Sequence, residues 1–246
     1  MGGRWHKLAF RWLAREETVP IADCVHFCGF RYGRGEYNPY ETYLRMSVGP
    51  EGPARARDRF NEFLQHYRPS DFGEALGLNL SRHYPLWLYP WSRRGPERSG
   101  WQENPDDCPD ILTHFSAKGI PRWRAEEELG WLNRALASIR EHGYQPAKFG
   151  SAIEARRLVR GDGKSAWLLL DGNHRVSALS ALGVERVAVR YLPPATVRET
   201  ELPRWGQVRN GVYDPGDAAK VFRVHFDGNR HPRTTERAAS FLEERP

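Results

Sequence analysis

The chain has little cysteine and no long hydrophobic run, and both shortages exclude classes of protein. It has three cysteines, Cys24, Cys28 and Cys108. A small, odd number of cysteines argues against a disulfide framework and suits a reducing cytoplasm. No apolar run reaches the roughly 18 residues of a membrane-spanning helix. The N-terminal residues lack the apolar segment and small-residue cleavage site of a signal peptide. We therefore expect a cytoplasmic protein without a membrane span.

Internal repeats and low-complexity segments are also missing. The 246 residues are 39% hydrophobic and 28% charged, which is typical of a folded chain of one large domain or two small ones. Nine tryptophans supply a core or a binding cleft. The net charge of +6 suits DNA, acidic lipids or phosphorylated metabolites as partners, or else only a solvated arginine-rich surface.

Cys24, His26 and Cys28 are spaced like part of a metal site. The spacing matches no common zinc pattern, and the sequence offers no evident fourth ligand. We therefore interpret these residues as buried thiols on a strand and predict no metal-ligating residues.

Hydrophobic periodicity predicts the elements along the chain. In the first half we expect an amphipathic helix over 1–19, a strand within 19–30, a short helix near 40–44, a helix over 54–68 and no long element in the Pro-rich stretch 79–110. In the second half we expect a helix over 126–141, a short edge strand at 144–149, a turn at 152–158, strands at 166–170 and 186–192, a helix over 174–182, and helices near 217–226 and at the C-terminus.

The most informative stretch is Asp171-Gly172-Asn173-His174-Arg175, which lies between the apolar run 166–170 and the predicted helix 174–182. A carboxylate, an imidazole and a guanidinium thus gather at a helix N-terminus, where backbone N–H groups and the helix dipole favour an anion such as phosphate. Taken singly, Asp171-Gly172 is also a good turn pair, Arg175 could form a surface ion pair, and His174 could be a buried, hydrogen-bonded histidine.

Residues 126–192 resemble the ParB/sulfiredoxin-like superfamily. The resemblance is carried by Asp171, Gly172, His174 and Arg175, by the following Ala178-Leu179 and Leu182-Gly183, and by the upstream Ser138-Ile139 and Gly143-Tyr144-Gln145-Pro146. It implies an α/β (α+β) fold with a small mixed sheet of that type. The sulfiredoxin branch has a nucleophilic cysteine where this chain has Asn173, and a carboxamide supplies no thiolate. The ParB branch is followed by a helix-turn-helix domain, which the tail 195–246 does not provide.

The free serine kinase branch is closest in motif, with Asp-Gly-His-His-Arg and a glutamate ahead of the long helix. This resemblance implies that an Asp and a Glu serve proton transfer and acceptor activation, while the His-Arg pair holds phosphate. Asp171, His174 and Arg175 match, Asn173 departs, and Glu126, Glu127 or Glu128 stands at the helix start. We take Glu128 as the acceptor-side carboxylate, although an acidic helix start is the simpler explanation of all three glutamates.

Phosphoryl transfer needs positive groups and N–H donors around the moving phosphoryl, and a carboxylate near the acceptor hydroxyl. Asp171 could be the base or could hold Mg²⁺ between phosphates. The groups expected to bind the nucleotide are Gly172, Asn173, His174, Arg175 and, one turn on, Ser177, for which a packing role is the alternative.

The sequence thus predicts three parts: an N-terminal extension 1–110, a core 111–194 and a C-terminal extension 195–246. The extensions pack on the core and are largely helical. The predicted function is a nucleotide-dependent phosphotransferase that uses ATP or ADP with Mg²⁺ on a hydroxyl of a small metabolite, a sugar or an amino acid. The alternative is a nucleotide-binding regulatory or DNA-associated protein without transfer chemistry; a nucleic-acid partner is not favoured.

Overall fold

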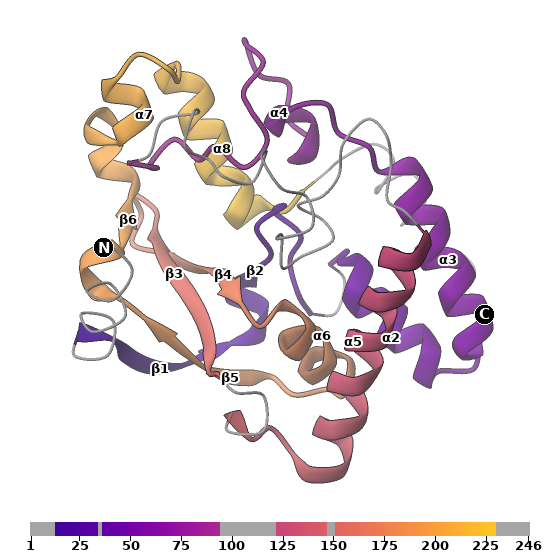
Figure 1. Ribbon diagram of the computed structural model, residues 1–246. Helices are drawn as coiled ribbons and strands as arrows, with labels where there is room; N and C mark the ends of the chain where they lie inside the picture. Colours follow the sequence, from indigo (N-terminus) through magenta and orange to yellow (C-terminus); the bar gives the residue numbers. More distant parts are fainter. Residues whose placement is uncertain (1–12, 34–35, 94–121, 147–150, 230–246) are drawn as a thin grey trace, which may run out of the picture.

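The computed structural model describes residues 13–33, 36–93, 122–146 and 151–229. A six-stranded sheet lies at its centre, with strand order β1-β5-β3-β4-β2 and β6 paired to β3 (Figure 1). The strands are β1 (Arg15–Pro20), β2 (Cys24–Val25), β3 (Ile153–Val159), β4 (Ser165–Asp171), β5 (Arg186–Tyr191) and β6 (Val197–Arg198).

The sheet is mixed. β1 with β5 and β3 with β4 are antiparallel, whereas β3 runs parallel to β5 and β6, and β2 runs parallel to β4. Helices cover both faces of the sheet, so the predicted α/β class with a small mixed sheet is confirmed.

The two faces of the sheet bury two separate hydrophobic cores, because successive side chains of a strand point to opposite sides. In β4, Trp167 and Leu169 belong to the first core, whereas Ala166 and Leu168 belong to the second. The first core is closed by α2 (Pro39–Val48), α3 (Gly52–His66), α5 (Arg122–His142) and α6 (Asn173–Ala181). The second is closed mainly by α4 (Phe72–Ala75) and α8 (Pro215–Asp227), next to α7 (Gly206–Arg209).

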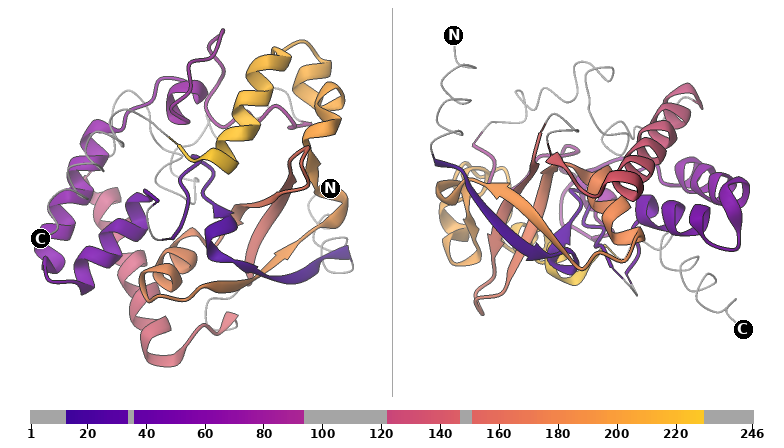
Figure 2. Two further views of the ribbon diagram at one scale, coloured as in Figure 1. Left: turned by 180° about the vertical axis from the view of Figure 1, so that it is seen from behind. Right: turned by 90° about the horizontal axis from the view of Figure 1, so that it is seen from below.

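The helices of the first core gather on one side of the molecule, away from α4, α7 and α8, in both Figure 1 and the reverse view of Figure 2. The starts of two helices, one from each core, follow local capping rules. Asn38 caps α2 by accepting from the N–H groups of Tyr40 and Glu41, and Pro39 occupies the first helical position. Asp214 caps α8 in the same way, ahead of Pro215. Within the described residues, short 3-10 helices at Ile21–Asp23, Pro193–Ala195 and Glu199–Arg204 complete the connections.

Most predicted elements of the second half are confirmed within a few residues: α5, β4, α6, β5 and α8. In the first half α2, α3 and a strand within 19–30, the two-residue β2, are confirmed, and 79–93 holds no helix or strand. The predicted terminal helix and the stretches 1–12, 94–121 and 147–150 lie outside the described residues, and 144–146 contains no strand.

Two element predictions are wrong. Residues 15–19 form strand β1 instead of the end of a helix; this strand is largely exposed and polar, so only its pairing with β5 defines it. Residues 153–159 form β3, which pairs with three other strands, instead of a turn. Arginines and a glutamate interrupt its apolar alternation and conceal it in the sequence.

The segments predicted as extensions contribute strands to the central sheet. The N-terminal segment supplies both outer strands of the main path, β1 and β2, and the C-terminal segment supplies β6. As a result, residues from the first hundred positions lie beside the start of α6.

Candidate functional site

A β-bulge positions the predicted motif at the end of β4. Ala155 pairs with Leu169 and Glu154 pairs with Asp171, so Leu170 has no partner on β3. The extra residue turns Asp171 onto the face that also carries Glu154, and Leu170 and Asp171 are both exposed. Bulges re-aim side chains in this way and are frequent next to active sites.

Gly172 makes the sharp connection from β4 to α6. Its φ of +94° lies in the left-handed region that favours glycine. A Cβ at this position would lie 2.8 Å from Ile153 Cγ1 and 3.0 Å from Arg175 Nη2. Conformation and close approach therefore both require glycine here.

Arg175 is buried, with 6% of its side chain exposed, and its guanidinium binds the protein itself. It donates to the carbonyl oxygen of Ser151, and Nη2 lies 3.4 Å from the carbonyl oxygen of Ala152. Nη2 also donates to Asp171 Oδ2 at 3.0 Å. The resemblance implies that Arg175 holds phosphate, but in this geometry its guanidinium fastens the start of β3 to the end of β4.

Asp171 is the exposed member of this cluster, with 52% of its side chain accessible. Its two hydrogen bonds, from Arg175 and from Ser151 Oγ at 2.9 Å, both go to Oδ2. Across the strands, Glu154 is half-buried, and its pKa is raised first by burial and then by the negative charge of Asp171, against Arg190 and Arg175. Sequence reasoning missed Ser151 and Glu154, since only the pairing of β3 with β4 brings them to the motif.

His174 points to a different partner. Its Nε2 lies 2.5 Å from Oε1 of Glu128 on α5, with 21% of the His174 side chain and 0% of the Glu128 side chain exposed. The other two candidate glutamates face arginines: Glu126 pairs with Arg57 at 3.5 Å and Glu127 with Arg124 at 2.5 Å. The structure thus selects Glu128 as the glutamate that reaches the motif.

Two aromatic rings flank the imidazole of His174. Tyr40 of α2 has its ring centroid 5.3 Å away, and Trp131 of α5 has its centroid 6.1 Å away. Arg45 of α2 also donates to the carbonyl oxygen of Ser180 near the end of α6 at 2.9 Å. The N-terminal segment is therefore part of the site. The many tyrosines of this segment are the sequence feature that could have indicated its role, although the sequence does not show which of them take part.

Asn173 and Ser177 do not face an anion with their side chains. Asn173 is buried, and its Oδ1 accepts a hydrogen bond from the hydroxyl of Tyr32 at 3.1 Å. Ser177 is fully buried, and its hydroxyl donates to the carbonyl oxygen of Asn173 at 2.9 Å. The geometry therefore favours the packing role for Ser177, and it places the Oδ1 of Asn173 against Tyr32.

The first turn of α6 has no side-chain cap. Its N-cap is Gly172, which has no side chain to accept from the first N–H groups. The N–H groups of this turn thus receive no hydrogen bond from a capping side chain, and Asp171 directly precedes the N-cap.

Cys24 and Cys28 are buried and form no disulfide. Burial raises the pKa of the Cys24 thiol. Nδ1 of His26 accepts from the N–H of Cys28 at 3.1 Å. In the described ranges, no three His, Cys, Asp or Glu side chains gather closely enough to hold a metal ion.

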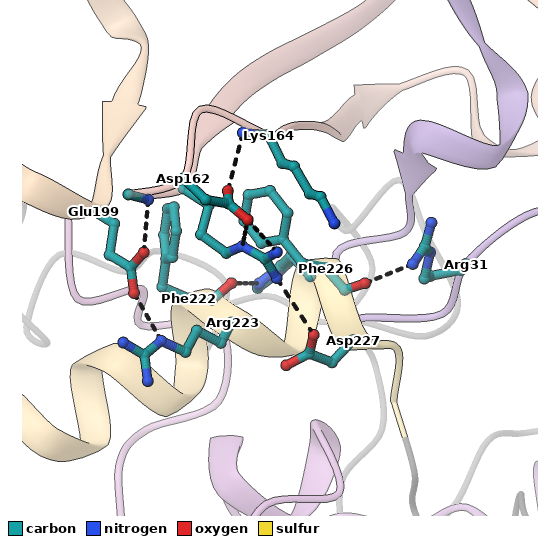
Figure 3. A network of polar contacts seen from close by, with 11 residues as sticks. Arg31, Asp162, Lys164, Glu199, Phe222, Arg223, Phe226 and Asp227 are labelled. Atoms are coloured by element: carbon teal, nitrogen blue, oxygen red, sulfur yellow. Dashed lines mark hydrogen bonds and ion pairs between the residues drawn. The ribbon is translucent and has the colours of Figure 1, made fainter.

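A second polar cluster lies at the turn of the β3–β4 hairpin (Figure 3). Asp162 accepts from the Arg160 guanidinium and, at 3.0 Å, from the N–H of Lys164. Glu199 accepts from the N–H of Gly161 and from Arg223 at 2.9 and 2.7 Å. These contacts fasten the hairpin turn to α8 and leave the carboxylates well bonded, as in a structural network.

No family model, curated protein or solved structure matches the chain significantly. The resemblance to the ParB/sulfiredoxin-like superfamily therefore stays a prediction that depends on the motif residues. Within the part of the chain that the structure describes, no helix has the length and apolar character needed to cross a membrane.

Proposed function

We propose that this protein is a nucleotide-dependent phosphotransferase that acts on a hydroxyl group of a small metabolite, a sugar or an amino acid. The observation that carries the proposal is the uncapped start of α6 at Gly172, with the exposed carboxylate of Asp171 on one side and His174 next along the helix. Backbone N–H groups in the first turn of a helix and the positive end of the helix dipole bind phosphate oxygens. A carboxylate at the same place serves proton transfer or metal binding.

Arg175 takes a supporting role in this proposal. Its guanidinium holds Asp171 and the backbone of Ser151 in place, so it fixes the carboxylate relative to the helix start. The phosphate ligands are then the backbone N–H groups of the first turn of α6. This assignment differs from the superfamily expectation that the arginine holds phosphate.

Mg²⁺ bound together with ATP or ADP suits the carboxylates on this side of the sheet. Mg²⁺ uses one or two carboxylates, with phosphate oxygens and water completing its shell. Oδ2 of Asp171 is taken by two hydrogen bonds, which leaves Oδ1, and Glu154 stands opposite on β3. When bound, the ion would neutralise negative charge on the phosphates. The absence of a Cys24–Cys28 disulfide is compatible with a cytoplasmic location, which we include in the proposal.

The test is a melting-temperature panel of ATP and ADP with and without Mg²⁺, followed by nucleotide consumption with and without candidate alcohols. A ligand at about 100 times its Kd stabilises the native state by about 2.7 kcal/mol. We expect a nucleotide-dependent rise in melting temperature and faster consumption with one class of alcohol.

Asp171→Asn should abolish consumption while nucleotide still binds, and Asp162→Asn at the hairpin turn is the matched control that leaves both unchanged. Binding with no acceptor effect, together with steeply salt-dependent duplex binding, would favour the DNA-associated regulator instead. No nucleotide binding at all would reject both functions.

A further inference from the structure

The Glu128 carboxylate is sealed inside the protein. None of its side chain is exposed, Oε1 contacts His174, and Oε2 has no hydrogen-bond partner among the described residues. Buried carboxylate oxygens are normally hydrogen-bonded, and a buried charge is stable only with a compensating partner. The one ion-pair partner of Glu128 within the described ranges is the imidazole of His174.

This geometry decides how Glu128 can act. A carboxylate with no exposed surface does not reach a substrate directly, whereas the imidazole beside it is partly exposed. A short contact to a carboxylate keeps the proton on Nε2 and stabilises the charged imidazolium. Nδ1 is the ring nitrogen that Glu128 does not contact.

The surroundings hold the imidazole in one orientation. The ring of Tyr40 comes from α2 and the ring of Trp131 from α5, so His174 is flanked by two helices besides its own. A side chain fixed in this way is poorly suited to follow a moving phosphate. It is well suited to a proton transfer, for which a fixed position is an advantage.

We propose that His174 is the general base toward the acceptor hydroxyl and that Glu128 is the positioning residue behind it. The proposal rests on the phosphotransferase function proposed above and assigns its proton transfer. The acceptor O–H bond breaks and its proton passes to Nδ1 of His174, while the acceptor oxygen bonds to the terminal phosphorus of the nucleotide. The bond from that phosphorus to the bridging oxygen breaks, the shortened nucleotide leaves, and the imidazolium returns its proton to water.

Asp171 then keeps the role of metal-linked carboxylate. Its Oδ2 already accepts two hydrogen bonds, and its neighbour is the buried guanidinium of Arg175. In this proposal the two side chains of the motif have different roles. Asp171 acts with residues at the start of β3, and His174 acts with Glu128 of α5.

The experiment compares wild type with Glu128→Gln, His174→Gln and the double variant, and uses Glu127→Gln as the control from the adjacent, exposed glutamate. Each of the two single changes should lower kcat by about 100-fold or more, because general-base catalysis contributes about 10²–10⁴-fold. The double variant should be no worse than the singles, since the residues act as a unit. Nucleotide binding should persist in all four variants, and Glu127→Gln should keep kcat within about twofold of wild type.

A second measurement needs neither activity nor a variant. The ¹⁵N shifts of the His174 ring in the wild-type protein should report the Nε2–H tautomer, and Glu128→Gln should relax that preference. Wild-type kcat in Glu128→Gln, or multiplicative losses in the double variant, would overturn the dyad while leaving the phosphotransferase standing. An Nδ1–H tautomer in wild type would overturn the dyad as well. Failure of wild type to bind nucleotide would reject the phosphotransferase, and the tautomer would then report only the Glu128–His174 contact.

Discussion

The β3–β4 hairpin carries a polar cluster at each end, and the two clusters differ in how their carboxylates are bonded. At the turn, Asp162 accepts from Arg160 and from a backbone N–H, and these bonds lower its pKa to about 2. At the open end, burial and the neighbouring Asp171 raise the pKa of Glu154. The turn end thus stabilises the negative charge of Asp162. At the open end, the carboxylates of Glu154 and Asp171 lie close together beside the start of α6.

The difference agrees with a structural role for the turn end and with the chemistry that we propose for the open end. A carboxylate with a guanidinium and an N–H fastens two segments and has little left to offer a ligand. Carboxylates whose charge is disfavoured are common at functional sites, because a ligand or metal ion can relieve that cost. The raised pKa of Glu154 occurs at the same end of the hairpin as the bulge at Leu170 and the left-handed Gly172.

The largest effect is expected from removing the guanidinium at the open end. Arg175→Leu leaves the carbonyl oxygens of Ser151 and Ala152 without their donor inside the protein, which should cost about 3 kcal/mol of unfolding free energy. Urea denaturation measures this loss. Arg223→Leu, at an exposed partner of Glu199 in the turn cluster, is the comparison and should cost well under half as much. Equal losses would remove the distinction between the two ends.

Two glycines sharpen the same comparison. Gly172 and Gly163 both have positive φ, +94° and +88°, but an added Cβ meets nothing within 4 Å at Gly163 and meets Ile153 Cγ1 at 2.8 Å at Gly172. Gly163→Ala should therefore cost about 1 kcal/mol of backbone strain. Gly172→Ala should cost at least about 1 kcal/mol more, because strain and overlap add. Thermal unfolding of both variants measures the difference, and similar melting temperatures would show that the start of α6 adjusts freely.

The smallest effects, of opposite sign, are expected from the two carboxylates. The raised pKa of Glu154 means that its ionisation opposes folding: the penalty is absent below its ordinary pKa of 4.5 and complete once pH exceeds the folded value. The lowered pKa of Asp162 means that its charge stabilises the fold above its ordinary 3.8, an effect lost as pH falls toward about 2.

At pH 7, Glu154→Gln should therefore raise the melting temperature slightly and Asp162→Asn should lower it slightly. The Glu154 difference should vanish below pH 4.5, and the Asp162 difference should shrink between pH 3.8 and 2. Melting curves over this range decide the matter, and a destabilised Glu154→Gln at neutral pH would contradict the crowding of charge at the open end.

Several elements could be predicted because their signal is local. The apolar run of β4, the glycine after it and the periodicity of α5 each reflect a few neighbouring residues, and the structure confirms these elements. β1 and β3 could not be predicted, because their polar residues carry no clear alternation and their pairing partners lie far away in the chain. The choice of Glu128 among three consecutive glutamates depended on the resemblance, and its contact with His174 is defined only in the folded structure.

The sequence alone determined that a strand, a left-handed glycine and a helix start bring Asp171, His174 and Arg175 together, because steric rules and helix periodicity act over a few residues. Only the tertiary structure decided what each side chain does there. Arg175 is directed inward by the carbonyl groups of 151–152, and Glu128 reaches His174 from another helix. Both outcomes depend on the desolvation of charges by distant parts of the chain, and burial of this kind arises only when the whole fold assembles.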